Sequence, residues 1–170
     1  MFELQVIGTE NSDQLVKLWV ETFKQAYEDV HSPEDIAAYC AANFTSDSAS
    51  RELSSPQTVC CIGSIENDPR GFYLVKHHSC PIAIDSDSSE LKQIYVLATE
   101  YGNGLGRSLY EHAIECIRAA GSGSVWLSVS DINYRAQAFY KKLGFDKLGR
   151  GPILKVGSER LASSIMAYKL

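Results

Sequence analysis

Apolar residues near the start of the chain change from alternating spacing to helical spacing. Residues 2–7 alternate in part between apolar and polar side chains, which predicts a first β-strand. A helix is expected from Asn11 or Ser12, either of which can cap it, to about Tyr27. The residues of its predicted buried stripe recur at i, i+3, i+4 and i+7: Leu15, Leu18, Trp19, Thr22, Phe23 and Ala26.

A second helix is predicted from Ser32-Pro33 to about Phe44. Serine is a common helix cap, and proline suits the first helical position because its missing N–H would be unpaired there. A short helical turn is predicted over residues 49–53.

The rest of the chain is predicted to consist of strands, followed by alternating strands and helices. Turn-forming residues over 66–71 separate two β-rich segments, and a loop rich in Ser and Asp covers 79–89. Helices are expected at 105–120 and 133–143. Strands are expected at 58–64, 72–77, 91–96, 124–130, 153–156 and 163–169. This order predicts one domain over residues 1–170, with a mixed α/β sheet covered by helices on both faces.

Composition narrows the class of protein. The 170 residues suit one core, with 45% hydrophobic and 22% charged residues. The formal net charge of -5 argues against nonspecific nucleic-acid binding and mildly favours a cationic substrate. No apolar run reaches the roughly 18 residues of a membrane helix, and the start has no basic, apolar signal pattern. We therefore expect a cytoplasmic protein without a membrane partner.

Cysteines and histidines do not predict a disulfide framework or a metal site. The five cysteines are odd in number and lack framework spacing, so free thiols are expected. His77-His78 with Cys80, and the pair Cys60-Cys61, place neighbouring side chains on opposite faces of a strand. No metal is therefore expected.

The most informative segment joins the strand at 91–96 to the helix at 105–120. It contains glycine at every second position, namely Gly102, Gly104 and Gly106. Glycine permits close backbone approach and positive φ, and the unpaired amides of a helix start bind anions. A pyrophosphate is the expected ligand, although an ordinary glycine-rich turn remains an alternative.

Two other phosphate-binding motifs fit this segment poorly. A P-loop ends in Gly-Lys-Ser/Thr, whereas Gly106 is followed by Arg107-Ser108. A dinucleotide-binding fold needs G-x-G-x-x-G, and here the third glycine comes one residue early.

Two motifs together resemble the GNAT superfamily of N-acetyltransferases. The segment Tyr101-Gly102-Asn103-Gly104-Leu105-Gly106 is similar to its Gln/Arg-x-x-Gly-x-Gly/Ala signature, with Tyr101 in place of Gln or Arg. The second motif has Asn133, Ala136, Tyr140 and the closing Gly144-Phe145 at the family's spacing. The resemblance implies a mixed, mostly antiparallel seven-stranded sheet with about four helices, and acetyl coenzyme A as cosubstrate.

The resemblance also implies roles for individual residues. Backbone groups of Ile94, Tyr95 and Val96 would line the pantetheine arm, and an amide of Val96 or Tyr95 would stabilise the oxyanion. The pyrophosphate would bind along the glycine loop, where Asn103 replaces a common Lys or Arg and Arg107 would supply a cation. Residues 101–107, Leu105 included, form this expected site.

Three side chains are candidates for chemistry or positioning. Tyr140 would act as the general acid that protonates the leaving thiolate; the alternative is a packed core aromatic. Asn133 would hydrogen-bond pantetheine, cap a helix, or do both. Glu90 lies eleven positions before Tyr101, as does the base of histone-acetylating members, but a solvated charge or a water chain remains open.

The acceptor is expected to be a small cationic amine. The outer segments, including Ser32-Pro33-Glu34 and the ending Met166-Ala167-Tyr168-Lys169-Leu170, resemble bacterial spermine/spermidine acetyltransferases of the PaiA type. Asp85, Asp87 and Glu90 would attract a polyamine, although Ser163 and Ser164 stand where that group often has an aspartate. A protein or peptide acetyltransferase, a coenzyme A sensor without turnover and a homodimer all remain open.

Overall fold

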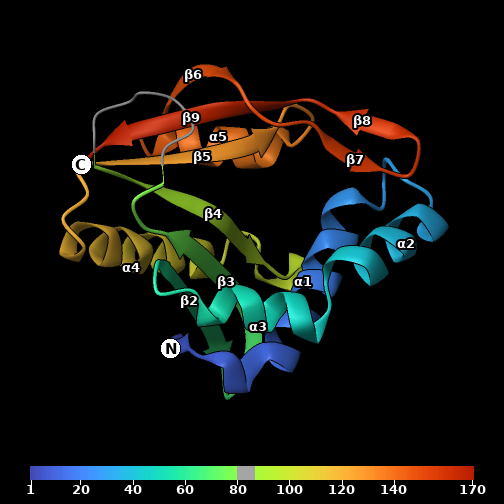
Figure 1. The fold of residues 1–170 in the computed structure, drawn as a ribbon, viewed down its shortest axis with the longest axis horizontal. Helices are drawn as coiled ribbons and strands as arrows, with labels where there is room; N and C mark the ends of the chain where they lie inside the picture. The colour runs from blue at the N-terminus through green and yellow to red at the C-terminus, as the bar shows by residue number, and fades with distance from the viewer. Residues whose placement is uncertain (80–86) are drawn as a thin grey trace.

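A seven-stranded sheet organises the computed structural model, which describes residues 1–79 and 87–170 (Figure 1). The strand order is β1-β2-β3-β4-β5-β9-β6. Every neighbouring pair is antiparallel except β4 and β5, which are parallel. The strands are β1 (Glu3–Ile7), β2 (Thr58–Ile65), β3 (Asp68–Lys76), β4 (Ser88–Val96), β5 (Ser124–Ser130), β6 (Asp146–Arg150) and β9 (Ser163–Lys169). The predicted mixed, mostly antiparallel α/β fold is confirmed.

Five α-helices and two short 3₁₀ helices accompany the sheet in the described part of the chain. The α-helices are α1 (Ser12–Tyr27), α2 (Pro33–Asn43), α3 (Ser46–Ser54), α4 (Leu105–Ala119) and α5 (Tyr134–Lys142). The 3₁₀ helices are η1 (Thr9–Asn11) and η2 (Ala98–Glu100). Within the described residues, no helix combines the length and apolar character needed to cross a membrane.

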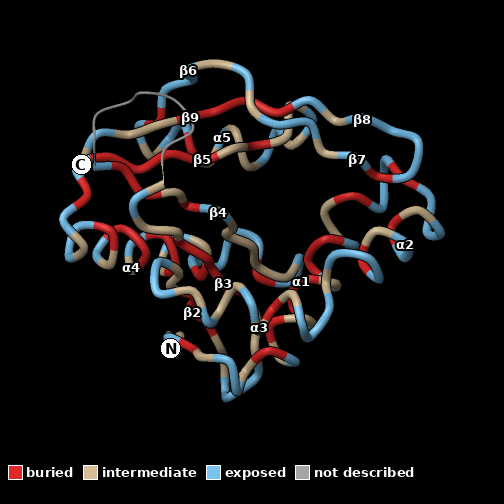
Figure 2. The backbone as a smooth tube through the Cα atoms, viewed as in Figure 1, coloured by how far each residue is buried: buried red, intermediate tan, exposed pale blue. Residues whose placement is uncertain are grey.

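The central strands are buried on both faces. Figure 2 shows β3 buried along most of its length, and its successive residues pack into cores on opposite faces of the sheet. Phe72 and Leu74 pack in a core with α1 and α3, whereas Tyr73 and Val75 pack in a core with α4 and α5. Because successive strand residues point to opposite faces, the helices form two separate layers. All four cysteines in the described residues are free, in agreement with the sequence-based prediction, and Cys80 lies outside those residues.

Several predicted boundaries were wrong. The expected helical turn at 49–53 is the nine-residue helix α3, which Thr45 caps together with Ser48 in a capping box, so the helix number of about four is one too low. The turn between β2 and β3 contains only Glu66 and Asn67, both at positive φ, as in a tight hairpin. Most of the loop predicted over 79–89, residues 80–86, lies outside the described residues, and Ser88 and Ser89 already belong to β4.

The C-terminal strands also differ from the prediction. The strand expected at 153–156 does not join the main sheet. Instead, β7 (Leu154–Val156) pairs with β8 (Glu159–Leu161) in a separate hairpin. Strand β6 was not predicted, because its sequence Asp-Lys-Leu-Gly-Arg lacks an alternating apolar pattern and all its residues are exposed or half-buried.

The parallel pair β4–β5 is short. It consists of the pairs Ser88–Ser124, Ser89–Val125 and Glu90–Trp126, after which the two strands diverge (Figure 1). From Leu91 to Val96, β4 therefore pairs only with β3 among the described strands. Backbone N–H and C=O groups require partners, so this open edge can accept an extended ligand.

Candidate functional site

The open edge of β4 leads directly to the start of α4. After Val96, the helix η2 and the glycine loop bring the chain to Gly104, the N-cap of α4. Gly104 has φ +94° and Gly102 has φ +83°, a left-handed conformation that favours glycine. No side chain caps α4, so the amides of its first turn are available to an anion.

Gly106 has no structural reason to be glycine. Its φ is not among the positive values, and a Cβ at this position would meet its nearest atom, Val96 Cγ1, at an ordinary 3.9 Å. A side chain here would instead extend into the space beside the first turn of α4. The missing side chain therefore leaves room for a ligand that approaches the backbone closely.

Side chains fix the shape of the loop. The Asn103 side chain donates to the Thr99 carbonyl at 3.2 Å and to Glu100 Oε2 at 3.4 Å, so it braces the loop. The Gln25 side chain from α1 accepts a hydrogen bond from the Ala98 amide at 2.7 Å. These contacts hold the glycine amides in one arrangement.

Two arginines lie near the expected anion site. Arg107 forms an exposed ion pair with Glu111 at 2.8 Å, an interaction that contributes little in solvent and can be exchanged. The Arg135 guanidinium lies 4.0 Å from the centre of the Tyr101 ring and so connects α5 to the glycine loop. Arg135 was not predicted as a site residue, although it lies two residues after Asn133 within the second motif.

The side chains of residues 94–96 on β4 pack into the cores on the two faces of the sheet, not toward the open edge. Ile94 and Val96 contact the core formed with α4 and α5, whereas Tyr95 contacts the opposite core and stacks with Phe72, with ring centroids 6.0 Å apart. Burial raises the pKa of Tyr95 well above its ordinary value, and nearby Tyr27 adds to the effect. The backbone of this segment is therefore what the open edge presents.

Tyr140 and Asn133 are positioned by α5. Burial raises the pKa of the Tyr140 hydroxyl, and the nearby phenol of Tyr110 raises it further, so Tyr140 is protonated at neutral pH. The nearby phenol of Tyr140 also contributes to the raised pKa of Tyr95. Asn133 caps α5 by accepting a hydrogen bond from the Ala136 amide at 3.1 Å, which leaves its Nδ2 group to donate.

Glu90 is the last residue of β4 that pairs with β5, directly before the open segment. It pairs with Trp126 on β5 and lies opposite Lys76 on β3. Burial raises the pKa of its carboxyl group above the ordinary value, although nearby Lys92 and Lys76 oppose this shift. Five residues separate it from Tyr95, which corresponds to roughly 16 Å along a strand. The structure therefore does not bring Glu90 to Tyr95.

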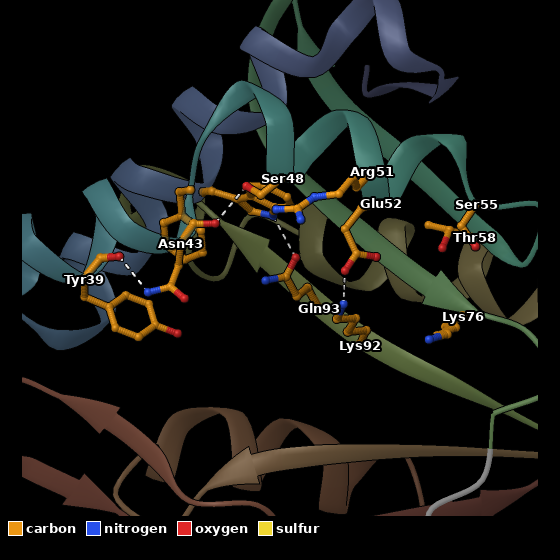
Figure 3. A pocket seen from close by; sticks show the side chains of 12 residues that line it. Tyr39, Asn43, Ser48, Arg51, Glu52, Ser55, Thr58, Lys76, Lys92 and Gln93 are labelled. Atoms are coloured by element: carbon orange, nitrogen blue, oxygen red, sulfur yellow. Dashed lines mark hydrogen bonds and ion pairs between the residues drawn. The ribbon is translucent and has the colours of Figure 1, made fainter.

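A cavity of about 500 Å³ lies on the α1–α3 side of β4 (Figure 3). Its lining residues are Trp19, Tyr39, Asn43, Phe44, Ser48, Arg51, Glu52, Ser55, Thr58, Lys76, Lys92 and Gln93. A second, much smaller hollow shares Trp19, Phe44 and Gln93 with it and reaches Tyr95. Trp19 Nε1 donates to Gln93 Oε1 at 2.7 Å where the two meet.

This cavity was not foreseen from the sequence, because its lining comes from separate segments that carry no motif. In the residues that the structure describes, no group of three or more His, Cys, Asp or Glu side chains could hold a metal ion.

Comparisons with known proteins agree with this geometry. Residues 13–145 match the family model described as the acetyltransferase (GNAT) family. An uncharacterised N-acetyltransferase of Mycobacterium tuberculosis is 26% identical over 160 residues, covering 94% of this chain and 98% of the relative. Streptothricin acetyltransferase of Streptomyces lavendulae is 29% identical over 112 residues, covering 66% of this chain and 56% of that protein.

Solved structures show the same fold. The crystal structure of PaiA N-acetyltransferase from Thermoplasma acidophilum in complex with coenzyme A has a TM-score of 0.81. It covers 100% of this chain and 99% of that chain at 20% identity. At this identity the likeness concerns the fold alone.

The replacement Gly106→Glu tests the anion site. The side chain clears Val96, so the fold should persist, but its carboxylate would occupy the first turn of α4. We expect the affinity for coenzyme A to fall by about 100-fold, since hydrogen bonds to charged groups contribute about 1.5–3 kcal/mol. Isothermal titration calorimetry measures this change.

Gly149→Glu is the matched control for that experiment. It makes the same chemical change on β6, where an added Cβ meets nothing within 4 Å. The control should bind coenzyme A as the parent does. A folded Gly106→Glu variant with parental affinity would contradict the site.

Replacing Glu90 by Gln tests the environment of the carboxyl group. A carboxyl whose pKa is raised in the folded state destabilises the fold as pH rises from the unfolded to the folded pKa. The neutral amide avoids this effect, so Glu90→Gln should be more stable than the parent at pH 7, with the difference shrinking toward acid pH. Urea midpoints between pH 4 and pH 8 would show it.

The exposed Glu159 on β8 offers a control, Glu159→Gln, which should show no such pH-dependent difference. A Glu90→Gln variant less stable than the parent at pH 7 would mean that Lys76 and Lys92 outweigh burial.

Proposed function

Because the chain belongs to the acetyltransferase (GNAT) family and is an acetyl coenzyme A-dependent N-acetyltransferase, we propose that its acceptor is the primary amine of a small molecule. The family and the cosubstrate expected from the two motifs are thereby confirmed. The observation that carries the proposal is the open edge of β4 leading to the uncapped start of α4, beside a cavity of small-molecule size.

For the donor, we propose that the pyrophosphate binds the amides of residues 101–107. Tyr101, Gly102, Asn103, Gly104, Leu105, Gly106 and Arg107 contribute mainly through their backbone, and the Arg107 and Arg135 guanidinium groups can turn to the phosphates. The pantetheine arm would extend along the backbone of Ile94, Tyr95 and Val96, with Asn133 Nδ2 as a further donor. A free amide of this segment would bind the carbonyl oxygen as negative charge develops there.

Tyr140 is the proposed general acid. The amine attacks the thioester carbonyl, a tetrahedral intermediate forms, and the carbon–sulfur bond breaks as the thiolate leaves. The raised pKa keeps the Tyr140 hydroxyl protonated, so it can donate a proton to the sulfur. Because the resulting phenolate would be buried, it must regain a proton quickly, and the proton released by the amine is the obvious source.

Glu90 is the proposed base, acting through water. Its raised pKa makes the Glu90 carboxylate a better proton acceptor than an ordinary one, but its distance along β4 from Tyr95 excludes direct contact with an amine at that position. A chain of water molecules on the α1–α3 side of β4 would carry the proton from the amine to the Glu90 carboxylate.

The identity of the acceptor is the finer part of the proposal. A polyamine was expected from Asp85, Asp87 and Glu90, but Asp85 lies outside the described residues and Glu90 lies close to two lysines. The fold likeness to PaiA supports testing polyamines.

We further propose one domain over residues 1–170, a cytoplasmic location and no nucleic-acid or membrane partner, and we leave a homodimer open.

Release of free thiol from acetyl coenzyme A tests the proposed function. A panel of polyamines, amino acids, short peptides and other small amines should contain a small amine that raises thiol release above background hydrolysis. Tyr140→Phe should then lower kcat by roughly 10²-fold without changing coenzyme A affinity, because a general acid is lost. Tyr134→Phe, an exposed tyrosine on the same helix, is the control.

Three results would contradict parts of this proposal. Turnover only with a protein or peptide would identify a protein acetyltransferase. Coenzyme A binding with no accepted amine would identify a sensor, and equal kcat for Tyr140→Phe and the parent would assign Tyr140 to packing.

A further inference from the structure

We propose that the acceptor amine also carries an anionic group, a carboxylate or a phosphate, which binds Arg51 and Lys76 in the cavity on the α1–α3 side of β4. This inference rests on the proposed function, because it names the class of amine that the same site would accept. It predicts an acceptor different from the polyamine suggested by the overall charge of the chain.

The cavity is positioned to hold the part of the acceptor remote from the reacting amine. It shares Trp19, Phe44 and Gln93 with the hollow that reaches Tyr95, so one molecule could extend from the open segment of β4 into the cavity. Lys76 lies four residues after Phe72, the residue of β3 that pairs with Tyr95, so it is roughly 13 Å from Tyr95 along the strands. The acceptor's anion and amine should therefore be separated by about that length.

The charge of the cavity favours an anion. Three cationic side chains line it, Arg51 from α3, Lys76 from β3 and Lys92 from β4, against one carboxylate, Glu52 (Figure 3). Lys92 is paired with Glu52, whereas neither Arg51 nor Lys76 has an ion-pair partner among the described residues. Glu90 lies opposite Lys76 on the neighbouring strand but forms no ion pair with it in the described part of the chain.

Arg51 and Lys76 thus remain as the two cations available to a ligand. A guanidinium can bind both oxygens of a carboxylate or phosphate, and an ammonium adds a point charge. The remote ammonium groups of a polyamine would be repelled by the same pair.

The remaining residues that line the cavity indicate the chemical character of the rest of the acceptor molecule. Trp19, Tyr39 and Phe44 form an aromatic cluster, with the Trp19–Phe44 centroids 5.4 Å apart and the Tyr39–Phe44 centroids 5.7 Å apart. Polar groups of Asn43 and Ser55 add hydrogen-bonding capacity. An acceptor with an apolar middle, an amine at one end and an anion at the other fits this lining.

Matched substrate pairs test the inference. The first pair is an amino acid with a spacer of about 13 Å between amine and carboxylate, together with its carboxamide. The second pair is an aminoalkyl phosphate and the corresponding amino alcohol, which separates phosphate from carboxylate recognition. With the parent protein, kcat/KM for the acid should exceed that for its neutral partner by at least about 10-fold in one pair, as expected for charge-assisted hydrogen bonds.

The double variant Arg51→Gln, Lys76→Gln should bring this ratio close to one, mainly through KM. Lys17→Gln, an exposed lysine on α1, should leave the ratio as in the parent. Circular dichroism and coenzyme A affinity establish that the double variant is folded. Should it fail to fold, the parent alone provides a second readout, because its ratio should fall as salt screens the exposed Arg51 and the half-buried Lys76.

Failure of this inference is distinguishable from failure of the proposed function. If neutral or polycationic amines are accepted as well as or better than the acids, the protein is an acetyltransferase for small amines and the anion subsite is wrong. A ratio unchanged in the folded double variant would also overturn it. If no amine of any charge is accepted, the proposed function itself fails.

Discussion

The early end of the parallel pairing between β4 and β5 is the constraint on which the rest of the site depends. Only three residue pairs join the two strands, and beyond Glu90 the main chain of β4 has one free edge. A free edge inside a sheet is costly unless something hydrogen-bonds to it. A pantetheine arm with amide groups can do so, and the glycine loop places an anion site at the end of the same edge.

The helices on the two faces of the sheet provide different parts of the proposed site. On one side, α4 and α5 provide the helix start for the pyrophosphate and the buried phenol of Tyr140. On the other side, α1, α2 and α3 surround the cavity with aromatic and cationic side chains. Because β3 and β4 alternate their side chains between these layers, donor and acceptor can approach the same strand from different sides.

The sequence predicted the parts of the molecule that have local patterns. The stripe from Leu15 to Phe23, the Ser32-Pro33 helix start and the glycine loop all depend on residues close in sequence, and the structure has the corresponding helices and loop. The weakly patterned β6 and the length of α3 were missed, because β6 is a strand only through pairing with β9 and α3 is set by the capping box at Thr45. The cavity could not be predicted, since Arg51, Lys76 and Lys92 come together only when three elements pack.

Hydrogen–deuterium exchange with and without coenzyme A tests the central claim most directly, because it reports on the backbone of β4 itself. Coenzyme A should slow exchange of amides in residues 91–96 and 102–107, while residues 60–64 of β2, which already pair on both edges, should be unaffected. Protection confined to other segments at saturating coenzyme A, with none at 91–96 or 102–107, would contradict the account.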